Sequence, residues 1–289
     1  MSIPRGRRRP TQLLAAGAVA LLATSCFGSD DAMPRTAPST QARAEGRTTT
    51  PSPSPTPQPP PEEDTCRRVS AEALRTIVND DPAVPCARRH TVVTFHVGRV
   101  PAGARDALSA ADAAVEVAAD RKCSRRFRDY AGGTYADRRL SMLTPTYFLP
   151  SGEQWTLGAR WVRCDAYAYA TPTRLADLPR SLEDAFERDR VSDRLTRCSP
   201  VSPSAADFRH VACEEPHRWR AVATENVGNR DERYPGRGTV QDRARNRCEE
   251  PVREYLGTQE SFSYGFEVPQ RDAWSEGDRV ALCWARTSE

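Results

Sequence analysis

The chain has 289 residues, of which 38% are hydrophobic and 28% are charged, and its formal net charge is +3. This length is enough for about two domains of ordinary size. Four arginines, Arg5, Arg7, Arg8 and Arg9, lie in an N-terminal segment that we expect to be removed, and without their four positive charges the total falls from +3 to −1. A near-neutral mature chain lacks the general attraction to phosphate that nucleic-acid binding needs, so we predict no nucleic-acid partner.

The N-terminus is typical of an export signal. A basic start is followed by the apolar run 13–23 and then by small residues. As a helix, this run of about eleven residues would rise about 16 Å, which is too short to cross a bilayer core of about 30 Å. We therefore predict a signal peptide over residues 1–25.

The signal ends in a cysteine that resembles a lipid attachment site. Ala23-Thr24-Ser25-Cys26 is similar to the lipobox of bacterial lipoproteins, although Ala23 stands where that motif prefers leucine. The resemblance implies cleavage before Cys26 and acylation, including palmitate, at that residue. Because two or more acyl chains hold a protein on a bilayer, we expect anchoring to the outer face of the cell membrane. An ordinary secretory signal is the alternative.

A spacer follows the cysteine, over residues 26–65. It is dominated by Pro, Thr, Ser and Ala, and its end reads TTTPSPSPTPQPPP. Its few apolar residues cannot offset the entropy of ordering the chain, so the segment is predicted to be a disordered linker with extended polyproline character. Such a tether would hold the remaining chain away from the membrane.

The remaining chain contains one pattern twice. Eight cysteines follow Cys26 in two sets of four: Cys66, Cys86, Cys123, Cys164, and Cys198, Cys213, Cys248, Cys283. Each set contains C-x3-H, then C-x6-Y-x-G, then P-x4-W-x2-G-x-R-x3-C, in the same order. This self-similarity indicates an internal duplication. We expect a first domain at 66–172, a connector at 173–196 and a second domain at 197–289.

Hydrophobic periodicity predicts the same elements in both copies. Strands are expected at 91–97 and 219–224, just after each C-x3-H. A helix follows in each copy, with a stripe from Leu108 to Tyr130 in the first and from Val240 to Tyr255 in the second. Two strands then complete each copy, at 141–149 and 159–169, and at 261–268 and 279–285. The predicted fold class is α+β, with one helix packed on a short antiparallel sheet in each copy.

Export would place the cysteines in an oxidising compartment, where disulfides persist. Four cysteines allow three pairings in each copy. We favour first with second and third with fourth, because the last pair would join the buried face of the helix to the final strand. The expected bridges are Cys66–Cys86, Cys123–Cys164, Cys198–Cys213 and Cys248–Cys283. A structural zinc site is the rival, but C-x3-H supplies only two ligands in each copy, so neither metal nor cofactor is expected.

A few polar and aromatic residues occupy equivalent positions in the two copies. They are His90 and His217, Trp155 and Trp274, and Arg160 and Arg279. The histidines are interpreted as hydrogen-bonded turn residues, with a functional role as the alternative. The tryptophans suit the core, and stacking on sugar rings is their alternative. The paired carboxylates, such as Glu214 with Glu215, do not recur between the copies, so no general acid or base is predicted.

The three motifs resemble the septum-formation domain of actinobacterial envelope proteins, over residues 66–286. The second copy is the better match, because it contains Gly277-Asp278-Arg279 where the first has Gly158-Ala159-Arg160. The resemblance implies a role in cell division and brings no catalytic mechanism. We therefore expect a non-enzymatic binding or scaffold module, with envelope proteins, division proteins or the cell wall as partners. The alternative is an exported enzyme or sensor that acts on wall material or a small ligand.

Overall fold

The computed structural model describes residues 55–187 and 193–287. The predicted signal peptide, Cys26 and the linker up to residue 54 lie outside the described residues. Among the helices that are described, none is both long and apolar enough to cross a membrane. We use "first repeat" for residues 66–172 and "second repeat" for residues 197–287.

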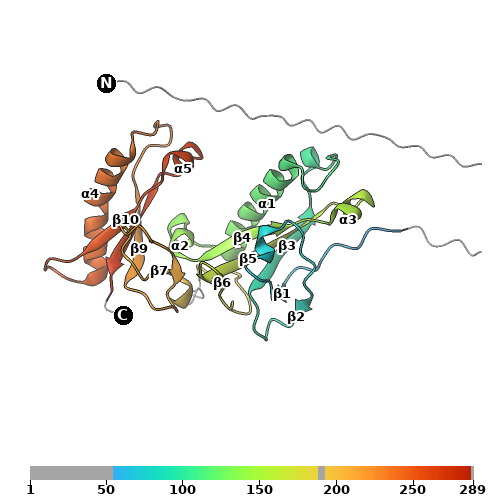
Figure 1. The fold of residues 1–289 in the computed structure, drawn as a ribbon, viewed down its shortest axis with the longest axis horizontal. Coiled ribbons are helices and arrows are strands. Elements are labelled where there is room, and N and C mark those ends of the chain that lie inside the picture. Colours follow the sequence, from blue (N-terminus) through green and yellow to red (C-terminus); the bar gives the residue numbers. More distant parts are fainter. Residues whose placement is uncertain (1–54, 188–192, 288–289) are drawn as a thin grey trace, which may run out of the picture. The chain divides into compact units, whose positions relative to one another are not determined.

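The first repeat is built on one antiparallel sheet (Figure 1). Its strands are β1 (Thr65–Arg67), β2 (Ala83–Val84), β3 (Val92–Arg99), β4 (Leu143–Phe148) and β5 (Trp161–Thr171). They lie in the order β2-β1-β3-β5-β4, and the short β6 (Arg174–Leu175) pairs with β5. The long strands β3 and β5 are rich in β-branched and aromatic residues, which favours their place inside the sheet.

The second repeat has a sheet with the same topology. Its strands are β7 (Arg197–Ser199), β8 (Val211–Ala212), β9 (Trp219–Asn226), β10 (Tyr264–Glu267) and β11 (Val280–Arg286). Their order is β8-β7-β9-β11-β10, which is the order of the first sheet strand for strand. The register agrees too, since Tyr147 faces Cys164 in one sheet and Phe266 faces Cys283 in the other. The duplicated cysteine pattern therefore corresponds to a duplicated α+β fold.

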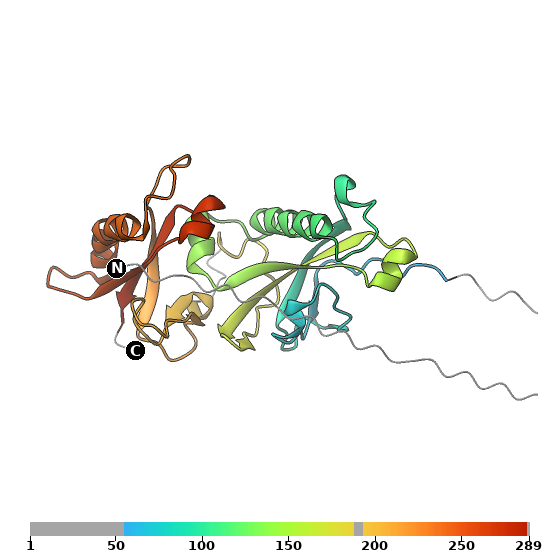
Figure 2. The ribbon, with the colours of Figure 1, turned by 45° about the horizontal axis from the view of Figure 1, so that its top comes forward.

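One long helix accompanies each sheet: α1 (Ala113–Ala131) in the first repeat and α4 (Arg237–Leu256) in the second. Figure 2 shows α1 along one face of its sheet, and α4 contacts β9, β10 and β11. Asp112 caps α1 by accepting a hydrogen bond from the Ala114 amide. Helix α1 begins later than the predicted stripe, whose first residue, Leu108, precedes the helix. The Leu108 side chain is 99% exposed and therefore does not belong to the buried face of the helix. Tyr255, the last residue of the other stripe, is also exposed.

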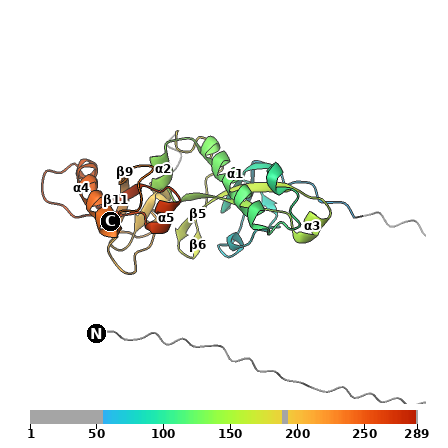
Figure 3. The ribbon, with the colours of Figure 1, turned by 90° about the horizontal axis from the view of Figure 1, so that it is seen from above.

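The structure contains shorter helices that hydrophobic periodicity does not reveal. They are α2 (Tyr135–Leu140), α3 (Gly152–Thr156) and α5 (Arg271–Ser275), with 3-10 turns at Ala73–Arg75, Ala102–Ala104 and Asp193–Leu195. Helix α3 joins β4 to β5 (Figure 3), and α5 joins β10 to β11. A capping box formed by Thr134 and Asp137 begins α2, which has no equivalent among the described elements of the second repeat.

Four disulfides link the helices and strands. They are Cys66–Cys86, Cys123–Cys164, Cys198–Cys213 and Cys248–Cys283. In each repeat one bridge joins the first strand to the residues after the second, and the other joins the long helix to the last strand. These are the four pairs that the predicted elements favour. Each of the eight cysteines is bonded to another cysteine of its own repeat, so the disulfides agree with the internal duplication.

The connector after the first repeat belongs to the core of that repeat. Leu178, Leu182 and Ala185 are buried in the same apolar cluster as Phe127. The Asp184 and Phe186 amides donate to the Tyr130 and Ala131 carbonyl oxygens near the end of α1. These contacts explain the scattered leucines of this charge-rich segment.

Candidate functional site

The shared tryptophan and arginine of the first repeat form one structural unit. The Trp155 side chain lies on α3, is 2% exposed, and donates from Nε1 to the Ala107 carbonyl oxygen at 2.9 Å. The Arg160 guanidinium carbon lies 4.0 Å from the centre of the indole ring. Arg160 also donates to the carbonyl oxygens of Arg105 at 2.9 Å and Trp155 at 2.6 Å. The guanidinium therefore stacks on the indole and, through its hydrogen bond to Arg105, holds the loop before α1 against it.

The second repeat builds the same unit from equivalent residues. Trp274 is also 2% exposed, and its Nε1 donates to the Glu232 carbonyl oxygen at 2.7 Å. The Arg279 guanidinium lies 4.1 Å from the Trp274 ring centre and donates to the Asn229 carbonyl oxygen at 3.1 Å. Because both indoles are buried and covered by arginine, neither offers a face to a sugar ring.

The glycine of the W-x2-G-x-R motif completes this unit. Gly158 and Gly277 end α3 and α5 with φ values of +101° and +99°. A side chain would be strained in this conformation, which is why glycine commonly follows the last turn of a helix. The motif therefore encodes a helix end, a buried indole and a stacked guanidinium, all of which are structural roles.

The two shared histidines also bond to the backbone. His90 is 1% exposed, and its Nδ1 donates to the Arg88 carbonyl oxygen at 2.8 Å, while its Nε2 lies 3.1 Å from the Pro179 carbonyl oxygen. His217 is 7% exposed, and its Nδ1 donates to the Glu215 carbonyl oxygen at the same distance of 2.8 Å. Both imidazoles thus fix the turn that follows the first disulfide of their repeat.

One histidine approaches a pair of cysteines, as a metal site would require. Side-chain atoms of Cys198, Cys213 and His217 lie within 4.8 Å of one another. The two sulfurs are bonded to each other as a disulfide, however, so neither is a thiolate that can coordinate zinc. The donor set does not fit a metal.

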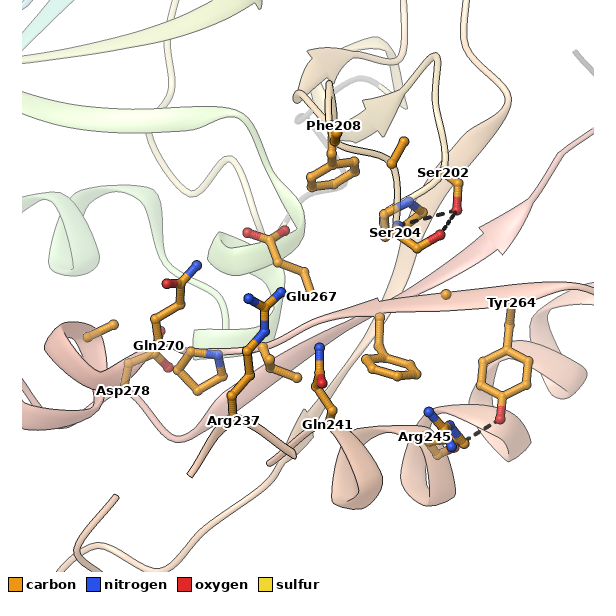
Figure 4. A pocket seen from close by; sticks show the side chains of 18 of the residues that line it. Ser202, Ser204, Phe208, Arg237, Gln241, Arg245, Tyr264, Glu267, Gln270 and Asp278 are labelled. Atoms are coloured by element: carbon orange, nitrogen blue, oxygen red, sulfur yellow. Dashed lines mark hydrogen bonds between the residues drawn. The ribbon is translucent and has the colours of Figure 1, made fainter. Parts of the chain in front are cut away.

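A hollow follows the edge strand β10 in the second repeat. It has a volume of about 890 Å³ and is lined by β10, by the loop 202–208 and by the first half of α4. Figure 4 shows Arg237, Gln241 and Arg245 on the helix side of the strand, with Ser202, Ser204 and Phe208 on the other side. Pro203 packs on Gly265 so closely that a Cβ at this glycine would lie 2.9 Å from the proline Cγ. The strand thus runs through the hollow with its outer edge uncovered by any other described strand.

Acidic groups at one end of this hollow are already paired. Glu267 accepts a hydrogen bond from His210 Nε2 at 2.8 Å, and Asp278 lies 3.2 Å from the Arg139 guanidinium of α2. Burial opposes ionisation of Glu267, but the hydrogen bond and charge of His210, with Arg197 and Arg139, outweigh it and lower the pKa of this carboxyl. Arg237 makes no ion pair with a described residue, and Arg245 has only the distant Asp242 at 3.8 Å. The uncompensated charge of the hollow is therefore positive.

A second hollow, of about 580 Å³, lies in the first repeat over a buried polar network. Arg163 and Asp165 are 2% and 0% exposed and form an ion pair at 3.0 Å. Thr94 donates to Asp165 at 2.7 Å and accepts from Arg67 at 2.7 Å. Burial and the charge of Arg163 lower the pKa of the Arg67 guanidinium. The described end of the linker lines this hollow, and the Gln58 amide donates to Gln154 Oε1 at 2.6 Å.

The hollow along β10 contains none of the shared candidates His90, His217, Trp155, Trp274, Arg160 or Arg279. Apart from Pro269, which is equivalent to Pro150, its residues along β10 and α4 differ between the repeats, so a search for shared positions passes over them. The available signal is the helix stripe itself. Arg237, Gln241 and Arg245 recur every four residues, and the first residue of this stripe starts α4.

A family model for septum formation matches the chain twice, over residues 37–164 and over residues 83–283. Each match ends on the fourth cysteine of a repeat, Cys164 in the first and Cys283 in the second. No curated protein and no solved structure matches the chain.

Proposed function

We propose, from the premise that this chain belongs to the septum formation family, that it is a non-enzymatic binding or scaffold module of the cell envelope that acts during septum formation. The family relates the chain to septum formation. The binding role, and the absence of a reaction, are our inference from how the two repeats use their residues.

One observation carries the proposal: the His, Trp and Arg residues that the two repeats share serve the fold, whereas most of the residues along the groove beside β10 differ from their equivalents in the first repeat. The two Trp–Arg units and the two backbone-bonded histidines are equivalent in both repeats. An enzyme needs polar groups that converge on a pocket, whereas these groups are satisfied by backbone carbonyl oxygens. A duplicated scaffold with two different surfaces suits two-point contact with partners.

We further propose that the chain is held on the outer face of the cell membrane through a lipid on Cys26. The four disulfides support an oxidising location outside the cytoplasm. The Pro-rich segment before Thr65 would then act as a tether between the lipid and the first repeat. Envelope proteins, division proteins or wall polymers on the outer face are the partners within reach.

The septal role is tested by imaging the full chain in dividing cells. The chain is fused at its C-terminus to a fluorescent protein that matures outside the cytoplasm, and the untagged chain is depleted in parallel. We expect enrichment at the division site and delayed or misplaced septa on depletion. A uniform membrane signal together with normal septa would overturn the proposal.

Lipid attachment is tested separately by metabolic labelling with an alkyne fatty acid. The wild-type chain should incorporate the label and remain with the membrane fraction. Cys26→Ala should incorporate none and appear in the medium or the soluble envelope fraction. Equal labelling of the two chains would contradict the anchor.

A further inference from the structure

The edge strands of the two sheets, β4 and β10, occupy equivalent places in the duplicated fold. The helix residues beside them carry opposite charges. Counting back equally from Cys123 and Cys248, the helix stripe beside the edge strand is Asp112, Glu116 and Asp120 in the first repeat. In the second repeat it is Arg237, Gln241 and Arg245. Since helix and strand are in contact in both repeats, the two stripes border equivalent edge strands, β4 and β10.

The edge of the first sheet is closed to another strand. Pro145 lies within β4 and has no N–H to offer, and edge strands commonly use proline to prevent pairing. Both edge strands are tied to their helices, since the Tyr147 hydroxyl donates to Glu116 at 3.0 Å and the Tyr264 hydroxyl donates to the Arg245 carbonyl oxygen at 3.1 Å. An acidic stripe and a proline therefore make the edge of the first sheet a poor site for an incoming chain.

The edge of the second sheet is open at the equivalent position. Pro145 faces Ala166 in its sheet, and Tyr264 faces Ala285, so Tyr264 stands where the first repeat has proline. A proline is accepted within an edge strand where the N–H of that position points away from the sheet. The Tyr264 N–H is therefore directed outward, toward the hollow of about 890 Å³ that follows this strand.

The spacing of the arginines selects an extended ligand. Arg237 and Arg245 are two turns apart on α4, with Gln241 between them, which is about 12 Å along a helix. Alternate side chains of a β-strand point to one face, and residues i and i+4 of a strand are about 13 Å apart. Two carboxylates at i and i+4 of an added strand would therefore match the two arginines, with a polar side chain at i+2 near Gln241.

We propose that the groove along β10 binds an extended acidic peptide segment of a partner protein by β-strand addition. The main chain of the segment would pair with the outer edge of β10, and its carboxylates would contact Arg237 and Arg245. Charge complementarity supports this occupant, because the two acids of the hollow, Glu267 and Asp278, are already paired within the protein. The inference rests on the proposed binding role and names the partner chemistry of that role.

The test measures binding of a fluorescein-labelled peptide, Thr-Glu-Val-Thr-Val-Glu-Val-Thr, to the full exported chain by anisotropy at low and physiological salt. Exchanging both glutamates for lysine should abolish binding. Arg237→Glu with Arg245→Glu should weaken it at least about tenfold and reduce its salt dependence. The matched control, Arg121→Glu with Arg125→Glu, changes two exposed arginines of α1 and should leave binding unchanged.

A second pair of variants tests the backbone contact. Tyr264→Ala removes the ring and keeps the N–H, whereas Tyr264→Pro also removes the N–H, as the first repeat does at Pro145. Loss of one hydrogen bond should make the proline variant bind about threefold to tenfold more weakly than the alanine variant. Circular dichroism and the melting temperature establish that both variants remain folded.

The proposal is overturned if the affinity does not depend on the backbone of the peptide. Equal affinity for the all-D peptide, for an N-methylated peptide, or for polyphosphate would show a general anion site. Absence of any peptide binding would overturn the groove assignment alone. Septal imaging of the full chain would still decide the proposed function separately, because it does not depend on this groove.

Discussion

The strand that carries the fourth cysteine has one buried face that is polar in the first repeat and apolar in the second. In the first repeat this face of β5 carries Arg163 and Asp165, which are 2% and 0% exposed. The equivalent positions of β11 are Leu282 and Trp284, which are 1% and 0% exposed. Strand order, register and disulfides are the same around them. One backbone therefore accepts either a polar or an apolar layer on this face.

The cover over each face explains the difference. In the first repeat Arg163 lies 4.5 Å from the centre of the Phe148 ring and bonds to the Asn79 side chain at 2.7 Å. In the second repeat Leu282 and Trp284 belong to an apolar cluster with Leu140 and Phe208 packed against it. A buried ion pair is tolerated only where further hydrogen bonds satisfy it, and the 77–82 loop of the first repeat supplies them.

Breaking the ion pair is expected to have the largest effect. Asp165→Ala leaves the buried Arg163 without its carboxylate, and it should lower the free energy of unfolding by about 3–5 kcal/mol in chemical denaturation. The double change Arg163→Met with Asp165→Ala removes both charges and should recover much of that loss. If the single and double variants are equally unstable, the face depends on packing and not on the pair.

The short-loop disulfides should respond alike in both repeats. Cys66–Cys86 and Cys198–Cys213 enclose 20 and 15 residues, so the loop-entropy relation gives each about 3 kcal/mol. Replacing both cysteines of either bridge by alanine should therefore reduce the free energy of unfolding by nearly the same amount. Non-reducing peptide mapping of the wild type is the accompanying check, and a bridge between the repeats would refute the equivalence.

Much of this shared framework can be predicted from cysteine spacing and periodicity. The third cysteine of each set falls on the apolar stripe of a helix and the fourth on the last predicted strand, so the bridge from helix to sheet follows from local pattern. Helix α2 does not follow, because its six residues are too few to show a period and its start depends on the Thr134–Asp137 capping box. The expected hairpins likewise contain helices α3 and α5 in place of tight turns.

The helix-end glycines should have a smaller and again equal effect. Gly158→Ala and Gly277→Ala each force a side chain into positive φ, and each should lower stability by about 1–2 kcal/mol. No heavy atom lies within 4 Å of the added Cβ at either position, so strain and not collision is the cause. Thermal unfolding of the two variants measures the comparison. A neutral result at one site would show that the two Trp–Arg units are not energetically equivalent.

The groove could be predicted less well than the framework. The shared His, Trp and Arg residues attract attention because they recur, yet the structure uses them to hold turns and helix ends. Arg237, Gln241 and Arg245 gain their significance only from the edge strand beside them, and from the acidic stripe at the same place in the first repeat. That contrast depends on which strand lies at the edge, which the order of strands along the chain does not state.

The smallest expected effect concerns Glu267, whose equivalent in the first repeat is Phe148, a residue that does not titrate. Its pKa in the folded state lies below the ordinary value of 4.5, because the hydrogen bond and charge of His210 outweigh burial. A carboxyl with a lowered pKa contributes stability above the unfolded value, and this contribution is lost as the pH falls through the folded value.

Glu267→Gln should therefore lower the free energy of unfolding at pH 7 and have progressively less effect below about pH 4.5. Because the Glu267 side chain is 37% exposed, solvent screening limits the loss at pH 7 to under about 1 kcal/mol. Urea titrations at a series of pH values measure it, with the exposed Glu260→Gln as the matched control. A loss that is the same at pH 3 and pH 7 would mean that the carboxamide disturbs packing and that the charge of Glu267 contributes nothing to the second repeat.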